Sequence, residues 1–172
     1  MQKIINLRKL IRNLFILMIV LCNIGCDQIT KTIVREHVDY NEKIEIISDH
    51  FTLTKIENSG AFLSLGDNLP VLVKIFLLSV LPLIVLSSGM YILLTKTEMA
   101  KSLIVGICFV IGGGIGNLYD RILYGSVTDF LHIDFILFQT GIFNMADVSI
   151  MTGMFIILLN LFQKKDVSAS FQ

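Results

Sequence analysis

Residues 75–95 read IFLLSVLPLIVLSSGMYILLT, a run of 21 residues without a charged side chain. An α-helix rises about 1.5 Å per residue and needs about 20 apolar residues to cross the hydrocarbon core of a bilayer. The run therefore predicts a membrane-spanning helix over residues 75–95. Pro82 can kink this helix because it removes one backbone donor, although neighbouring helices can compensate for that loss in lipid.

Two apolar stretches that follow predict further spans. Residues 102–119 carry no charged side chain, and residues 135–163 contain a single ionisable group, Asp147. Each stretch is long enough for a helix to cross most or all of the hydrocarbon. We therefore expect spans over residues 102–119 and 141–163, with an acidic side chain near the start of the last one.

The N-terminal segment allows two interpretations. Its uncharged run, residues 14–26, has only the length of a signal peptide, and it ends in the Gly-Cys pair of a lipoprotein cleavage site at Cys26. Such a site requires a small residue three places before the cysteine, but Asn23 occupies that position. A helix over residues 11–33 reaches spanning length if Arg12 and Lys31 extend towards polar surroundings. We favour this uncleaved first span over a cleaved signal peptide.

The composition agrees with a membrane protein. Hydrophobic residues make up 54% of the chain and charged residues 16%, whereas soluble domains carry about 25% charged residues. The mean hydropathy of +0.76 excludes a water-soluble protein with a single core. The net charge is zero, so the charge balance gives no indication of a nucleic-acid partner. The three cysteines lack paired spacing, which predicts neither disulfides nor a zinc site.

Basic residues near the span ends predict the orientation, because they favour the cytoplasmic side. They lie before or at the start of the first span, between the second and third, and after the fourth: Lys3, Arg8, Lys9, Arg12, Lys96, Lys101, Lys164 and Lys165. Both termini are therefore expected in the cytoplasm, which leaves residues 34–70 and about 120–139 outside.

The outer segment 34–70 contains a hairpin pattern. Residues 44–46 and 51–57 alternate apolar and polar side chains and are separated by a short polar turn. We expect a small sheet on the membrane surface, leading into residues 58–61. Neither repeats nor flexible linkers divide the sequence, so residues 1–172 are interpreted as one domain.

Ionisable groups at membrane depth are costly and are functional by default. Five aspartates fall near the predicted outer ends of the spans: Asp27, Asp120, Asp129, Asp134 and Asp147. Asp27 and Lys31 are spaced i, i+4 and can pair on a helix, while Asp120 precedes Arg121 and can be neutralised by a nearby charge. For Asp27 and Asp120 we therefore favour charge pairing.

Asp129 and Asp147 are flanked by apolar residues and need partners from elsewhere in the fold. If they meet in a medium of low dielectric constant, the two carboxyl groups should share one proton. Such a pair can hydrolyse a peptide bond, with one carboxylate taking a proton from water and its protonated partner polarising the carbonyl. Two alternatives remain open from the residues alone: a proton relay in a small transporter or channel subunit, and a non-catalytic membrane scaffold.

Other polar and glycine motifs have structural explanations. Residues 112–117 read GGGIGN but lack the spacing of a nucleotide-binding loop, so Gly112 and Gly116 are expected to allow close helix packing. Asn117 and Asn144 each lie near the outer end of a span and can supply amide donors and acceptors to a site there. The three histidines lack the spacing of metal ligands.

Taken together, five sequence blocks resemble the bacterial lipoprotein signal peptidase family, signal peptidase II. In order, they are DQITK at 27–31, NSGA at 58–61, GGGIGNLYDR at 112–121, VTDF at 127–130 and FNMAD at 143–147. Each block alone is weak, but five in the family's order on a protein with four predicted spans form a strong resemblance.

The resemblance implies a membrane-embedded all-α aspartic endopeptidase of the bacterial cytoplasmic (inner) membrane, with a small extracytoplasmic sheet and an active site near that face. It would remove signal peptides from prolipoproteins just before a diacylglyceryl-modified cysteine, in contact with membrane lipid and without a metal or other cofactor. The family's catalytic positions match Asp129 and Asp147. Its supporting positions match Asp27, Lys31, Asn58, Gly60, Asn117, Arg121 and Asn144. The family's inhibitor globomycin is expected to block this site.

One block departs from the family pattern. The usual Asn-x-Gly-Ala-Ala-Phe-Ser appears as NSGAFLS over residues 58–64, with the aromatic residue one place early. In an extended segment a shift of one place moves a side chain to the opposite face. The roles of Phe62 and Ser64 are therefore not implied, whereas those of Asn58 and Gly60 are.

Overall fold

The computed structural model describes residues 2–40, 42–47, 50–61, 65–66, 68–135 and 138–169, with side chains described only between residues 7 and 163. In chain order the elements are α1 (Gln2–His37), β1 (Ile44–Ile47), β2 (Phe51–Asn58), α2 (Val71–Ile75), the π-helical turn η2 (Phe76–Val80), α3 (Leu81–Thr95), α4 (Lys101–Tyr124), β3 (Val127–Phe135), β4 (Phe138–Gln139) and α5 (Met145–Ala169). Phe62 and Ser64, in doubt from the sequence, lie outside the described residues.

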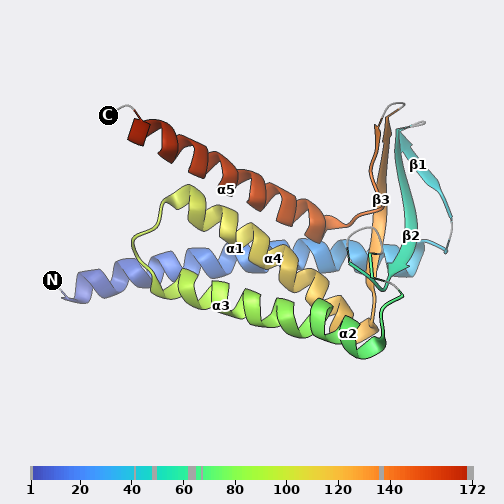
Figure 1. The fold of residues 1–172 in the computed structure, drawn as a ribbon, viewed down its shortest axis with the longest axis horizontal. Coiled ribbons are helices and arrows are strands. Elements are labelled where there is room, and N and C mark those ends of the chain that lie inside the picture. Colours follow the sequence, from blue (N-terminus) through green and yellow to red (C-terminus); the bar gives the residue numbers. More distant parts are fainter. Residues whose placement is uncertain are drawn as a thin grey trace.

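Four helical segments of the described chain are long and apolar enough to cross a membrane. They cover Leu7–His37, Val71–Thr95, Lys101–Tyr124 and Met145–Gln163, which confirms the four predicted spans. The first three extend beyond the predicted limits, and the last begins at Met145 instead of residue 141. Figure 1 shows both termini at one end of the helical bundle and the sheet at the other.

The second span is continuous through Pro82 because the helix changes its hydrogen bonding there. The π-helical turn η2 ends directly before α3, and Pro82 occupies one of the first two positions of α3. Proline is tolerated in the first turn of a helix because its missing N–H has no partner to lose there. A π-helical turn is one of the local adjustments by which a helix in lipid accommodates proline.

Helix α4 lies at the centre of the bundle and packs against α1, α3 and α5. Of its most apolar part, 50% is buried, compared with 17% for α1. Glycines allow this close contact, since a Cβ at Gly112 would lie 2.6 Å from Asn23 Cβ of α1, and one at Gly113 would overlap the carbonyl oxygen of Ala146 on α5. The structure thus confirms a packing role for the glycine run.

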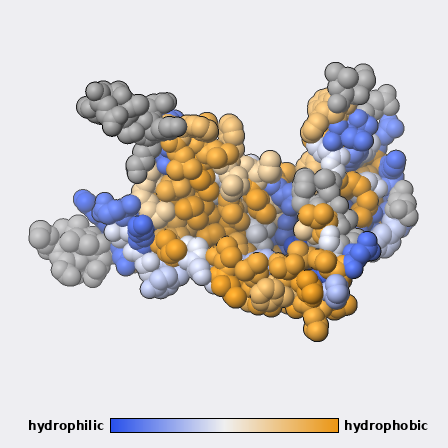
Figure 2. All heavy atoms as spheres, in the orientation of Figure 1, coloured by the Kyte–Doolittle hydropathy of each residue, from blue (hydrophilic) through white to orange (hydrophobic). Residues whose placement is uncertain are grey.

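The outer surfaces of the helices form an apolar band. Large hydrophobic side chains of all four spans are exposed there, and Figure 2 shows the band over the helices, with hydrophilic residues on the sheet and at the opposite end. A contiguous apolar surface of this kind is typical of contact with lipid. The buried core between α1, α3 and α4 is also apolar and centres on Ile16, Leu93 and Cys108.

The sheet has four strands in the order β1-β2-β3-β4, with antiparallel pairing throughout. The predicted hairpin is confirmed as β1 and β2. Strands β3 and β4 were not predicted, because the expected strands lay only within residues 44–57. The pairing of β2 with β3 places Ile56 opposite Asp129 and Asn58 opposite Val127, so the sheet brings the ends of two sequence blocks together.

Candidate active site

A polar cavity of about 130 Å³ lies where the bundle meets the sheet. Its walls come from the end of β2 and the segment after it, the C-terminal half of α4, the start of β3, and the start of α5 with the segment before it. The lining residues are Asn58, Ala61, Asn117, Arg121, Val127, Asp129, Ile142, Asn144 and Asp147. The structure therefore brings the two aspartates singled out from the sequence to one cavity, together with four of the seven expected supporting residues.

Asp147 is fixed by the beginning of α5. The backbone N–H of Asn144 donates to Asp147 Oδ2 at 3.1 Å, and the backbone N–H of Asp147 donates to Asn144 Oδ1 at 3.0 Å. This reciprocal pair is a capping box, and an acid in the first turn also interacts favourably with the helix dipole. The cap explains why α5 begins at Met145. Asn117 Nδ2 of α4 donates to Asp147 Oδ1 at 2.9 Å, so both carboxylate oxygens have donors.

Asp129 lies on β3 and is only 5% exposed. Asn58 Nδ2 donates to its Oδ2 at 2.9 Å, and Asn144 Nδ2 donates to its Oδ1 at 2.6 Å. Burial, with a smaller contribution from the nearby charge of Asp147, raises the pKa of Asp129 to about 6, against the opposing effect of the two amide donors. Asp129 therefore holds a proton more readily than an ordinary aspartate.

Asn144 contacts both acids. Its side-chain amide donates to Asp129 and, at 3.1 Å, to Asn117 Oδ1, while its backbone N–H donates to Asp147. The two carboxyl groups are thus held in one cavity by a shared asparagine. A buried carboxyl group with a raised pKa beside a second carboxylate can supply a general acid and a general base.

A buried charge cluster supports the cavity from the side of α1. Lys31 Nζ lies 2.8 Å from Asp27 Oδ2 and 3.0 Å from Asp120 Oδ2, and it donates to Asn117 Oδ1 at 2.9 Å. The expected pairing of Asp27 with Lys31 is therefore confirmed. Asp120 is neutralised by Lys31 and by Arg35 Nη2, which lies 2.9 Å away. We call Asp27, Lys31, Arg35 and Asp120 the buried charge cluster.

The cluster also joins α1 to α5. The backbone N–H of Ala146 donates to Asp27 Oδ1 at 2.8 Å, next to the aspartate in the cavity. Gly116 leaves room for this carboxylate, because a Cβ there would overlap Asp27 Oδ2. Asp27 thus fixes the residue directly before Asp147, although it does not line the cavity.

The segment after β2 closes one side of the cavity. The backbone N–H of Gly60 donates to Asn58 Oδ1 at 3.0 Å, and Asn58 Nδ2 also donates to the carbonyl of Ala61 at 3.0 Å. Arg121 Nη2 donates to the carbonyl of Gly60 at 2.9 Å. Gly60 therefore takes part through its backbone, and Arg121 faces this segment while its neighbour Asp120 faces α1, because successive residues of a helix are rotated by about 100°.

A polar contact on the strands next to the site was not predicted from the sequence. Thr128 Oγ1 donates to Glu57 Oε1 at 2.8 Å and accepts from Arg35 Nε at 2.8 Å. Glu57 and Thr128 are paired across β2 and β3, each next to a residue of the cavity. Only the strand register could have revealed this contact, since neither residue stands out in the sequence.

Other candidates lie away from the cavity. Asp134 is exposed at the far part of β3, where its backbone pairs with His50. Within the ranges that the structure describes, no group of three or more His, Cys, Asp or Glu side chains is placed to hold a metal ion.

Comparison with known proteins assigns the family. A family model described as signal peptidase (SPase) II matches residues 19–163. The lipoprotein signal peptidase of Brevibacillus brevis is 35% identical over 140 residues, covering 81% of this chain and 89% of the relative. That of Streptococcus thermophilus is 31% identical over 149 residues, covering 87% and 93%.

Solved structures agree with these relatives. A bacterial membrane enzyme determined by the in meso method superposes with a TM-score of 0.78 at 25% identity, covering 88% of this chain and 89% of that one. A second structure of the same description gives a TM-score of 0.74 at 26% identity, covering 86% and 92%. The chain therefore belongs to the signal peptidase II family, whose members, the lipoprotein signal peptidases, are aspartic proteases.

Proposed function

We propose that this chain cleaves the signal peptides of prolipoproteins just before a diacylglyceryl-modified cysteine, with Asp129 and Asp147 as its catalytic pair. The family accounts for the cleavage of lipoprotein signal peptides. The observation that carries the assignment of the pair is that both carboxyl groups line one small polar cavity and share Asn144 as a partner.

In the proposed mechanism Asp147 is ionised and Asp129 is protonated when substrate binds. Asp147 takes a proton from water, whose oxygen attacks the carbonyl carbon, while Asp129 donates its proton to the carbonyl oxygen. Collapse of the tetrahedral intermediate returns that proton to Asp129 and breaks the C–N bond. The proton on Asp147 passes to the leaving amine of the cysteine. Burial and the raised pKa of Asp129 favour this distribution of roles.

Arg121 is suited to orient the substrate. It lines the cavity, and its Nε is buried without a hydrogen-bond partner in the described part of the chain. A buried donor without an acceptor is costly, and a peptide carbonyl in the cavity would satisfy it. We assign Arg121 the binding of a substrate carbonyl, and Asn58, Asn117 and Asn144 the orientation of the two acids.

The charge distribution supports a location in the bacterial inner membrane with the cavity near the extracytoplasmic face. The described basic residues Arg8, Lys9 and Lys101 lie near the starts of α1 and α4, and Figure 1 shows these helix ends opposite the sheet. Basic residues near span ends favour the cytoplasm. A signal peptide that enters as an apolar helix would then present its cleavage point to a cavity at the outer surface. The whole chain, residues 1–172, would act as one domain.

The pair is tested by cleavage of a purified lipidated precursor with wild-type protein, Asp129→Asn and Asp147→Asn. Each variant should lose at least about 10²–10⁴-fold in rate, the usual contribution of general acid–base catalysis, while still accumulating in the membrane. Asp134→Asn is the matched control, because Asp134 lies on β3 outside the cavity, and it should retain activity. Globomycin should inhibit the wild type. Substantial cleavage by either cavity variant would exclude the pair.

A further inference from the structure

A second hollow lies at the end of the bundle that carries the termini, between the first turns of α1 and the start of α4. It is a cavity of about 730 Å³. Its lining includes three basic residues, Arg8, Arg12 and Lys101, and the apolar residues Ile11, Phe15 and Ile104. We call these six residues the basic groove. It lies at the far end of the bundle from the cavity that holds the two aspartates.

The basic groove changes from charged to apolar along the helix axes. On α1 its residues are spaced i, i+3, i+4 and i+7, so they share one face of the helix. Arg8 lies nearest the helix end and Phe15 lies roughly 10 Å deeper, at about 1.5 Å per residue. On α4, Lys101 is at the helix end and Ile104 is one turn deeper. This gradient matches a lipid, which carries a polar headgroup above an apolar chain.

The charges of the groove are not balanced by acids. No acidic residue lines this cavity among the described residues, and the three ion pairs found in them all involve Lys31 or Arg35. Arg12 Nη2 donates to the carbonyls of Leu93 and Lys96 at 2.9 and 2.7 Å, but its Nε is buried without a hydrogen-bond partner in the described ranges. An anion in the groove would complement all three cations.

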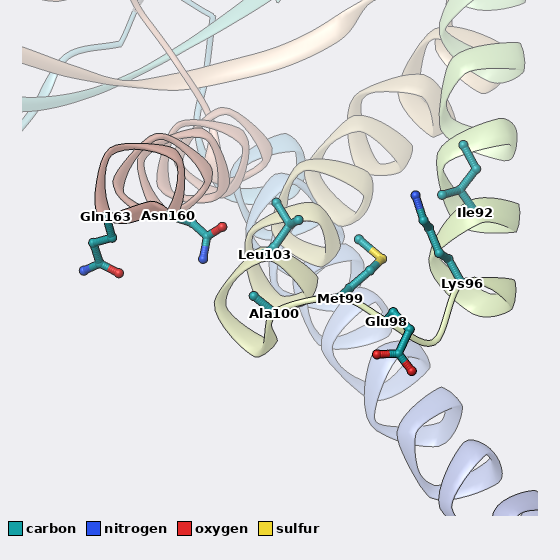
Figure 3. A pocket seen from close by; sticks show the side chains of 8 residues that line it. All are labelled: Ile92, Lys96, Glu98, Met99, Ala100, Leu103, Asn160 and Gln163. Atoms are coloured by element: carbon teal, nitrogen blue, oxygen red, sulfur yellow. The ribbon is translucent and has the colours of Figure 1, made fainter. Parts of the chain in front are cut away.

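A neighbouring hollow shows the contrast. It has a volume of about 560 Å³ and lies on the other side of the link between α3 and α4, with Met99 contributing to both hollows. Figure 3 shows Lys96 and Glu98 in its lining, with the amine and the carboxylate pointing away from each other. Because this lining contains both signs of charge, it has no preference for anions comparable to that of the basic groove.

We propose that the basic groove binds an anionic phospholipid of the bilayer. Its phosphate lies between Arg8 and Lys101, near Arg12 Nε, and one acyl chain runs along Ile11, Phe15 and Ile104. Basic pockets between membrane helices bind anionic headgroups in this way. The apolar wall selects a lipid over a soluble phosphate. The bound lipid joins α1 to α4, which goes beyond the cleavage function and does not depend on it.

The test uses the purified full chain in detergent, with bound lipid counted by native mass spectrometry. Phosphatidylglycerol is compared with phosphatidylcholine of the same acyl chains, and glycerol phosphate serves as the headgroup without chains. The variant Arg8→Gln/Lys101→Gln should bind phosphatidylglycerol about 25-fold more weakly than wild type, because each basic residue contributes roughly fivefold near an anionic lipid. Lys9→Gln/Lys96→Gln removes the same charge outside the groove and should bind like wild type.

The outcomes distinguish lipid binding in the basic groove from nonspecific electrostatic attraction between anionic lipid and basic residues. Equal losses in the two double variants, equal binding of the two lipids, or full competition by glycerol phosphate would each overturn the proposal. Precursor cleavage and thermal unfolding of Arg8→Gln/Lys101→Gln show whether it is folded, since neither residue lies in the proposed active site. If it does not fold, Ile11→Trp takes its place. Ile11 is exposed, so the larger side chain of this variant would fill the groove without changing its charge. The variant should also lose bound phosphatidylglycerol, and unchanged binding would overturn the proposal.

Discussion

Replacement of Lys31 by Met should strongly destabilise the protein because it removes the cation at the centre of the buried charge cluster. Lys31, Asp27 and Asp120 are each 0% exposed. Without Lys31, Asp120 retains Arg35 at 2.9 Å, whereas Asp27 retains only neutral donors, the N–H of Ala146 and the amide of Gln28. The substitution therefore leaves one buried carboxylate without a neighbouring cation partner in the described part of the chain.

The expected loss in the free energy of unfolding is about 3–5 kcal/mol, the usual cost of removing one partner of a buried ion pair. The double variant Asp27→Asn/Lys31→Met eliminates the unpaired charge and should recover about 2 kcal/mol of this loss. Lys9→Met is the matched control, since Lys9 is an exposed lysine on the same helix, and it should change stability by less than about 0.5 kcal/mol.

The assay is equilibrium unfolding in mixed micelles, followed by precursor cleavage. Cleavage by Lys31→Met should fall by about 10-fold or more, because Asn117 Oδ1 loses one of the two donors that orient this side chain towards Asp147. A loss of stability no greater than that of Lys9→Met would refute the reasoning. So would a double variant no more stable than Lys31→Met, because the unpaired charge of Asp27 would then not be the cause.

Two further predictions concern pH and packing. Because burial raises the pKa of Asp129 from 3.8 to about 6, the folded chain retains a proton that the unfolded chain releases, and stability should fall by up to about 3 kcal/mol as pH rises from about 4 to 6. Asp129→Asn should remove this decrease when the free energy of unfolding is measured as a function of pH. An unchanged pH dependence would contradict the assignment of the raised pKa to Asp129. Gly113→Ala should lower the thermal unfolding temperature in detergent, at a cost of about 1–3 kcal/mol, because its Cβ would overlap the Ala146 carbonyl. Gly25→Ala, with no atom within 4 Å of the added Cβ, should leave that temperature unchanged or raise it, and equal effects of the two substitutions would refute this explanation.

The four spans could be predicted because lipid imposes a local rule. Backbone groups in hydrocarbon must be satisfied within the segment, so an apolar run of sufficient length is enough to indicate a helix. The ends of the spans were less accurate for a physical reason. The third span was predicted to end at residue 119 because the charged Asp120 follows. Helix α4 instead continues to Tyr124, since Asp120 is neutralised by Lys31 and Arg35 of another helix.

The start of α5 and the strand β3 show what depends on specific hydrogen bonds. The last span begins at Met145 because Asn144 and Asp147 cap the helix, which hydropathy does not reveal. Strand β3 was missed because its stability comes from pairing with β2, between residues that are 69 to 82 positions apart in the sequence. The hairpin β1–β2 was predictable because its strands are adjacent in the sequence.

Apolar runs in the sequence were enough to predict four membrane spans, and the residues flanking Asp129 and Asp147 marked both as acids without a cationic neighbour. These properties depend on composition and spacing along one segment. The groups that those acids contact, and the pairing within the buried charge cluster, became visible only in the folded arrangement. Burial makes each such charge costly. Its partners lie on other parts of the chain, so only the folded arrangement determines which groups offset that cost.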